Sequence, residues 1–331
     1  MLERVRLANF RSHEAYRLDC KPSTTLILGE NGCGKTSVLE AIYIALQGKS
    51  FRAVDREIVK RETDFYRIEV EFDSGERTIV TYDGNKRQFL VGDRKAARLP
   101  KKYKHPVVLF LPSDLNLVEA SPTRKRDFFD RLGAQLNADY SNSLSRYNKA
   151  LKQRNELLKR PDADEGALFS WNLLMAKYGV EIRQERTRMV EELNRRLTEA
   201  YRSIAENHDT VRMIYDSYTG ESSESEYLRL LSLDYERDHL TGHTNFGIHK
   251  DDFEFVFNEV GAEGNASRGE MRSIMLALKF IESDLLHETF GERPLVLLDD
   301  VFSELDDTRQ KALTTNFERN QVILTSVKAP F

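Results

Sequence analysis

The sequence has few cysteines, no long apolar run and no excess of positive charge, and each absence argues against a class of protein. Only Cys20 and Cys33 occur in 331 residues, which is not the composition of a disulfide-stapled secreted scaffold. No run approaches the roughly 18 apolar residues of a membrane span. The sequence also starts without a basic leader followed by an apolar segment. We therefore expect a cytoplasmic protein that is neither exported nor bound in a membrane.

The net charge of −4 gives no global reason to expect a polyanionic partner. Binding to nucleic acid would therefore depend on local patches. One basic window, in which Asp93 is the only acid, contains Lys86, Arg87, Arg94, Lys95, Arg98, Lys101, Lys102 and Lys104. A solvated loop and strand edge explains this window at least as well as a binding face does.

A phosphate-binding loop is the most specific motif in the sequence. Residues 29–36 read GENGCGKT and fit the pattern G-x-x-x-x-G-K-[ST]. Residues 24–28 have the pattern of a buried strand, and residues 37–46 that of an amphipathic helix. Such a loop turns its N–H groups, and the positive end of the helix, toward phosphate. A turn that merely caps a helix would not need this context. The residues expected to bind ATP are Gly29, Asn31, Gly32, Cys33, Gly34, Lys35, Thr36 and Ser37.

Two acids at the end of an apolar run form the expected second half of the site. Residues 295–300 read LVLLDD. We expect Lys35 to reach the β- and γ-phosphates, and Thr36 and Asp299 to hold Mg²⁺. Asp300 can then polarise the attacking water as the general base, so Lys35 and Asp300 are the expected catalytic residues. Because the two halves lie far apart in the sequence, a large insertion must separate strands of one sheet.

The remaining pattern predicts mixed sheets and a helical hairpin. Strands are expected at residues 5–10, 24–28, 66–72, 78–82, 89–91, 106–111, 211–215, 253–257, 295–298 and 322–324. Between residues 121 and 204 the apolar spacing is helical, with a break at 161–166, and the many charges suit an arm exposed on most sides. The second helix of this hairpin would be on the order of 50 Å long. Residues 219–226 are expected to form a loop, and residues 272–290 a helix.

Two further short motifs flank the acid pair. The segment 265–270 reads NASRGE, and the segment 303–306 reads SELD. They resemble the signature motif and the D-loop of ABC-type ATPases. In that family the signature of one subunit closes on nucleotide held by the other. The resemblance implies that Ser267 and Gly269 bind ATP in trans. A simple helix N-cap is the alternative role of Ser267.

Within that superfamily the chain resembles the RecF family of bacterial recombination-mediator ATPases, which is related to SMC and Rad50. Residues 7–12, 111–115, 122–130, 249–252 and 298–306 carry the resemblance, together with the phosphate loop and the signature. The short arm also fits, because SMC and Rad50 have far longer coiled coils.

Some positions depart from the pattern of these families. Glu270 stands where many ABC proteins have Gln, and Asp300 is shorter than the usual glutamate, which indicates slow turnover suited to a switch. Ser113 stands where RecF proteins often have Glu. The transporter histidine is missing, which leaves Thr325 or Ser326 to sense the γ-phosphate.

The resemblance implies an α/β fold: a P-loop ABC-type ATPase head with mixed β-sheets and an inserted helical arm. We expect residues 1–120 and 209–331 to form the head and residues 121–208 the arm. It further implies Arg11 as a phosphate neighbour, and an ATP-dependent homodimer that clamps gapped or duplex DNA near single-strand to double-strand junctions. RecR and RecO would be partners in placing RecA during repair and replication restart. The DNA contacts expected are Arg52, Arg56, Lys60, Lys86, Arg87, Lys101 and Lys102.

Two other functions use the same loop. A small-molecule phosphotransferase would grip an acidic substrate with the basic window, would act as a monomer and would give Ser267 and Gly269 no role. The ATPase module of a transporter would have a separate membrane chain as its partner.

Overall fold

The computed structural model describes residues 1–160, 165–217 and 223–329, and the chain forms two compact units. Met1–Asp114 and Glu282–Phe331 form the first, here called the head unit. Leu115–Ile281 form the second, here called the helical unit. Among the described residues no helix is both long enough and apolar enough to cross a membrane.

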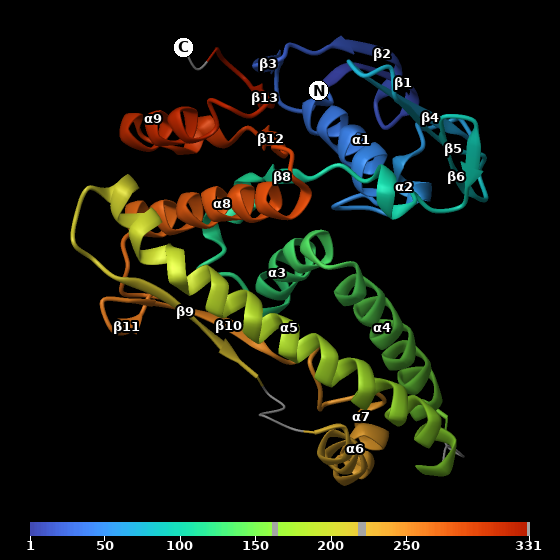
Figure 1. Ribbon diagram of the computed structural model, residues 1–331. Helices are drawn as coiled ribbons and strands as arrows, with labels where there is room; N and C mark the ends of the chain where they lie inside the picture. Colours follow the sequence, from blue (N-terminus) through green and yellow to red (C-terminus); the bar gives the residue numbers. More distant parts are fainter. Residues whose placement is uncertain (161–164, 218–222, 330–331) are drawn as a thin grey trace. The chain divides into compact units, whose positions relative to one another are not determined.

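The head unit contains two sheets (Figure 1). An antiparallel sheet has the order β2-β1-β4-β5-β6-β7, and its strands are β1 (Leu2–Phe10), β2 (His13–Asp19), β4 (Tyr66–Phe72), β5 (Arg77–Tyr82), β6 (Arg87–Val91) and β7 (Arg94–Ala96). A parallel sheet has the order β3-β13-β12-β8, and its strands are β3 (Thr24–Leu28), β8 (Val107–Phe110), β12 (Leu295–Asp299) and β13 (Val322–Ser326). Every residue of β8, β12 and β13 is buried, as expected for parallel strands covered on both faces. The strands predicted within residues 1–114 and 282–331 are confirmed.

Helix α1 (Lys35–Gln47) packs against both sheets of the head unit. It contacts β1, β4 and β5 of the antiparallel sheet, and β8, β12 and β13 of the parallel sheet. All of its residues except Thr36 are buried, so the amphipathic pattern predicted for residues 37–46 was wrong about the exposed face. A helix between two sheets has no side for water, which is why its sequence is apolar almost all round. The shorter helices described in or at the border of this unit are α2 (Asp55–Ile58), η1 (Lys101–Tyr103), η2 (Pro112–Asn116), η3 (Val301–Glu304) and α9 (Asp307–Asn316).

The helical unit is built around a helical hairpin, which confirms that prediction (Figure 1). Its elements are α3 (Pro122–Leu136), α4 (Ala138–Leu158), α5 (Glu165–Ala205), β9 (Val211–Asp216), α6 (Glu224–Leu233), α7 (Tyr235–Thr241), β10 (Asp252–Phe257), β11 (Val260–Gly261) and most of α8 (Arg268–Phe290). With 41 residues, α5 is about 60 Å long. It packs against α4, α6 and β9, so the prediction of an arm exposed on most sides was wrong.

Some predicted boundaries in this unit also need correction. The predicted loop at 219–226 is wrong at its end, because α6 begins at Glu224, and residues 219–222 lie outside the described residues. Residues 161–164 of the predicted break at 161–166 also lie outside the described residues, and helix α5 begins at Glu165. Helix α8 begins four residues earlier than predicted, at Arg268. The helical unit also includes residues 209–281, which the sequence assigned to the head, because β9 and β10 pair with each other and pack with α5 and α3.

Several charges of the hairpin are buried in ion pairs rather than exposed. Arg186 on α5 donates to Asp130 at 2.9 and 3.0 Å, and to Asp251 at 3.2 Å. His249 lies between the hydroxyl of Tyr147, at 2.9 Å, and the carbonyl of Thr244, at 3.0 Å. Burial lowers the pKa of His249 to about 4. The motif at 249–252 therefore serves the packing of this unit.

The buried pair of Arg154 and Asp238 gives a stability prediction. The two side chains have 0% exposure and lie 2.6 Å apart. The substitution Arg154→Met leaves the carboxylate of Asp238 buried without its cation, so we expect a loss of about 3–5 kcal/mol in the free energy of unfolding. Urea denaturation followed by circular dichroism measures it. The matched control, Lys159→Met, removes an exposed pair with Glu156 and should leave the midpoint unchanged. Equal midpoints for the two variants would contradict the prediction.

Candidate nucleotide-binding site

The phosphate loop connects β3 of the parallel sheet to α1 in the head unit. Gly32 and Gly34 have φ angles of +85° and +99°, a conformation that L side chains rarely adopt. Gly34 is the N-cap of α1. A Cβ atom on Gly34 would lie 2.4 Å from Nε2 of His13 and 2.6 Å from Oγ of Ser12. The turn between β1 and β2 therefore packs directly against the loop, and only glycine fits at position 34.

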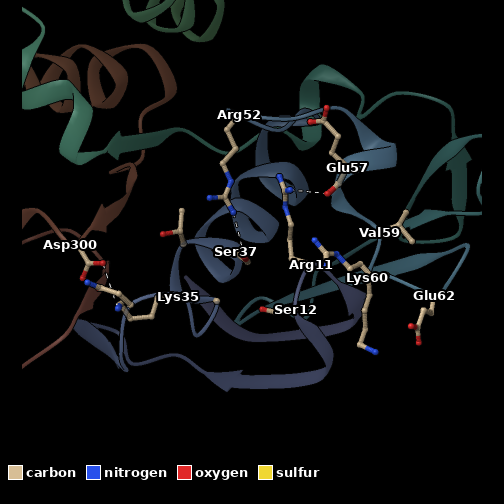
Figure 2. Close-up of a pocket in the computed structure, with 15 residues that line it drawn as sticks. Arg11, Ser12, Lys35, Ser37, Arg52, Glu57, Val59, Lys60, Glu62 and Asp300 are labelled. Atoms are coloured by element: carbon tan, nitrogen blue, oxygen red, sulfur yellow. Dashed lines mark hydrogen bonds and ion pairs between the residues drawn. The ribbon is translucent and has the colours of Figure 1, made fainter.

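Lys35 holds the loop in place through its own ammonium group. Its Nζ donates to the carbonyl oxygens of Gly29, at 2.8 Å, and Glu30, at 3.2 Å. It also lies 3.6 Å from Oδ2 of Asp300, and Figure 2 draws this pair. The ammonium group is thus directed into the loop, beside the carboxylate predicted to act as the base.

The two halves of the predicted site meet at Thr36 and Asp299. Oγ1 of Thr36 donates to both carboxylate oxygens of Asp299, at 2.9 and 2.8 Å. Thr325, at the end of β13, donates to Oδ1 of Asp299 at 2.9 Å and accepts the N–H of Asp300 at 2.9 Å. Because β13 lies between β3 and β12, the end of the phosphate loop and the acid pair are brought to the same edge of the sheet.

Asp299 lies in a setting that suits a cation. Burial raises the pKa of Asp299 above its ordinary value, hydrogen bonds from Thr36 and Thr325 oppose this rise, and the charge of Asp300 adds to it. A divalent cation would compensate the buried carboxylate. One carboxylate and one hydroxyl are oxygen donors of the kind that Mg²⁺ uses together with phosphates and water. The residues therefore fit the predicted ion.

A cavity of about 700 Å³ lies in the head unit, and loop residues including Gly32, Gly34 and Lys35 line part of it. Basic and acidic side chains outside the loop also line the cavity, namely Arg11, Arg52, Lys60, Arg61, Glu57 and Glu62. Figure 2 shows the Lys35–Asp300 pair to one side of Ser37, and Arg11, Lys60 and Glu62 to the other. Arg11 lines the same cavity as the loop residues, and its role as a phosphate neighbour stays a prediction. Arg52 and Lys60, predicted to contact DNA, line the same cavity.

The predicted signature residues lie at the start of α8. Ser267 is exposed, its N–H donates to Oε2 of Glu270 at 2.6 Å, and its Oγ accepts the N–H of Glu270 at 3.3 Å. This reciprocal pair is a capping box. It matches the alternative weighed for Ser267, and it leaves a role in trans to be tested by experiment. Gly269 is half-buried in the first turn.

Other predicted residues have partners within the chain. Arg87 lies 3.2 Å from Asp55, and Oγ of Ser326 donates to the carbonyl of Lys328 at 2.6 Å. Glu40, whose carboxylate joins Arg11 and Arg52, was not predicted from the sequence. The sequence does show a glutamate inside the apolar run 37–46. Because a buried acid requires partners, this position could have been predicted to contact basic residues.

Known proteins match the chain over nearly its whole length. Residues 1–331 match the family described as RecF/RecN/SMC N terminal domain. The DNA replication and repair protein RecF of Staphylococcus epidermidis is 33% identical over 336 residues, covering 96% of this chain and 90% of the relative. That of Staphylococcus carnosus is 34% identical over 333 residues, with the same coverage of 96% and 90%.

Solved structures agree with the sequence relatives. A structure described as the recombination mediator protein RecF-ATPrS in the RecFOR pathway has a TM-score of 0.88 at 27% identity, and the match covers 100% of this chain and 93% of that one. An Smc head bound to the C-winged helix domain of ScpA has a TM-score of 0.51 at 16% identity, covering 99% of this chain and 90% of that one. The second likeness concerns the fold alone.

The loop geometry gives a prediction with a built-in control. The substitution Gly34→Ala places a methyl group against the side chains of His13 and Ser12 at a positive φ angle, so the loop or these two side chains must shift, and nucleotide affinity should fall at least about tenfold. Gly32→Ala has a similar φ angle but meets no atom within 4 Å, so its loss should be clearly smaller. Titration with a fluorescent ATP analogue measures both. Equal losses would show that the close approach of the β1–β2 turn does not matter.

Proposed function

Because the chain belongs to the RecF family of the RecF/RecN/SMC ATPases, we propose that it is an ATP-operated switch that acts on DNA in recombinational repair. The contact of Thr36 with Asp299 carries this proposal, because it joins a phosphate loop to an acid pair in one site. The whole-length match leaves the phosphotransferase alternative without support.

In this proposal the loop N–H groups, from Gly29 to Ser37, bind the phosphates of ATP. Thr36 and Asp299 hold Mg²⁺, which neutralises developing phosphate charge when it is bound. Lys35 turns from the loop carbonyls to the β- and γ-phosphates. This rearrangement separates Lys35 from Asp300 and leaves the carboxylate, which is 28% exposed, available to accept a proton from the attacking water.

We further propose that ATP joins two copies of the chain. In the closed dimer, Ser267 and Gly269 of each copy contact the phosphates held by the other. Exposure of Ser267 at the N-terminus of a 23-residue helix supports this, because such an end has N–H groups and a positive dipole for an anion. The capping box occupies one of these N–H groups in the single chain.

DNA is the proposed macromolecular ligand, bound through its backbone near single-strand to double-strand junctions. RecR and RecO are the proposed partners in placing RecA. The names of the relatives, DNA replication and repair proteins, support DNA as the ligand. Within the basic window, Lys101 and Lys102 are exposed and make the better candidates, whereas Arg87 pairs with Asp55. Contacts of this kind are independent of sequence and sensitive to salt.

Dimerisation can be tested with a variant slowed in hydrolysis. With ATP and Mg²⁺, Asp300→Asn should sediment at twice the 38.3 kDa of the monomer, because the nucleotide stays intact. Adding Ser267→Asp keeps a good N-cap but brings a negative charge to the phosphates, so the dimer should disappear while the melting temperature stays unchanged. A dimer that survives Ser267→Asp would refute the role in trans.

DNA binding gives a separate prediction. ATP should strengthen binding to gapped duplex at moderate salt, in a filter-binding assay, and binding should weaken steeply as salt rises. Reversing two charges with Lys101→Glu and Lys102→Glu should weaken it equally on unrelated sequences. The control reverses two exposed charges on α4, Lys149→Glu and Lys152→Glu, and should change it less. The DNA clamp is wrong if ATP has no effect on binding by the parent.

A further inference from the structure

A buried carboxylate lies directly behind the two arginines of the nucleotide cavity. Glu40 on α1 has 0% exposure. Its oxygens accept hydrogen bonds from Arg11, at 3.0 and 2.9 Å, and from Nε of Arg52, at 3.0 Å. Oγ of Ser50 adds a further donor at 2.6 Å. Burial by itself raises the pKa of Glu40, but the hydrogen bonds from Arg11, Arg52 and Ser50 outweigh it and hold the pKa below its ordinary value. The carboxylate is therefore charged and fixed in place.

Both arginines are also held by groups other than Glu40. Nη1 of Arg11 donates to the carbonyl of Glu57 at 2.8 Å, and its backbone N–H donates to the carbonyl of Ile58 at 2.7 Å. Nη2 of Arg52 lies 3.3 Å from Oγ of Ser37, in the first turn of α1 (Figure 2). A guanidinium has more N–H donors than these contacts use, so both groups retain donors for a ligand. Two cations against one anion leave this cluster with a positive charge.

The position of the cluster indicates which part of a nucleotide it faces. Lys35 and Asp300 mark the end of the cavity where the γ-phosphate belongs, because the loop lysine reaches the β- and γ-phosphates. In Figure 2 Arg11 lies on the opposite side of Ser37 from that pair. Ser37 follows Thr36, and it is the residue that Arg52 contacts. The arginines therefore face the α-phosphate end of a bound nucleotide, which ATP and ADP share.

We propose that Glu40 is a positioning residue that presents Arg11 and Arg52 together to the α-phosphate end of the nucleotide. The inference rests on the proposed function, because it requires that the cavity bind ATP. A long side chain that must be ordered on binding reduces affinity, and a fixed, planar guanidinium avoids that loss. Glu40 thus contributes to affinity without touching the ligand.

The test is Glu40→Gln, measured by titration with ATP and with ADP and by steady-state hydrolysis. We expect the affinities for ATP and ADP to fall alike, by about tenfold, and the KM for ATP to rise with kcat unchanged. The direction of the change in nucleotide affinity distinguishes positioning from simple charge attraction. Removing a negative charge from the cluster would by simple attraction tighten the binding of an anion, so tighter binding would overturn the proposal. A loss confined to ATP would also overturn it, because it would place the arginines at the γ-phosphate.

Two further variants separate positioning from folding. Glu69→Gln removes another buried carboxylate of the head unit, one that joins Arg6, Arg67 and Arg77 and lies outside the cavity lining, so it should leave nucleotide affinity unchanged. Ser50→Ala removes one hydrogen bond from Glu40 without burying an unpaired charge, and should reduce affinity in the same direction by a smaller factor. It serves as the test if Glu40→Gln does not fold.

A double-variant cycle gives the final criterion. If Glu40 acts partly through Arg11, then Glu40→Gln should cost less affinity in the Arg11→Gln background than in the parent, and the cost that remains belongs to Arg52. Fully additive losses would overturn positioning through Arg11. A parent protein that binds neither ATP nor ADP would refute the proposed function itself. A parent that binds both, with an unchanged Glu40→Gln variant, would refute only the inference about Glu40.

Discussion

The hydrogen bonds from Thr36 to Asp299 join the two halves of the nucleotide site, and they depend on how the strands and α1 of the head unit pack. They require that the start of α1 lie close to the end of β12, although Thr36 and Asp299 are far apart in the sequence. This requirement is met because β13 inserts between β3 and β12, and because α1 packs against both sheets. The apolar residues of α1 and of the parallel strands fix these elements by burial. Their positions bring the hydroxyl of Thr36 to the carboxylate of Asp299 beside the phosphate loop.

Three buried charges in the described part of the chain have several partners each. Glu40 has two arginines and a serine hydroxyl, Asp299 has two threonine hydroxyls, and Arg186 has two aspartates. Desolvated charges are stable only when hydrogen bonds replace water, so each cluster constrains the orientation of its members. In the helical unit this constraint fixes the packing of the hairpin. In the head unit it orients the groups that line the cavity.

The sequence predicted much of the fold, and the failures have identifiable causes. Strands with period-two or continuous apolar patterns were recognised, because burial dictates those patterns directly. The predicted α/β ABC-type head with mixed sheets and a helical insertion is confirmed by the RecF and SMC-head matches. The exposure of α1 and α5 was predicted wrongly, because a helical pattern does not reveal how many elements cover a helix. The start of α6 was missed, because Ser223 and Glu224 occur as readily in loops as at an N-cap.

By itself the sequence determined the phosphate loop, the acid pair and the family, because these depend on residue types at fixed short spacings. Only the tertiary structure decided that Thr325 contacts both acids, that Arg52 lines the nucleotide cavity and that Glu40 joins Arg52 to Arg11. These residues lie in different segments of the chain and are not joined by a short motif of fixed spacing. Their proximity follows from strand order and from packing on α1, which local patterns do not encode.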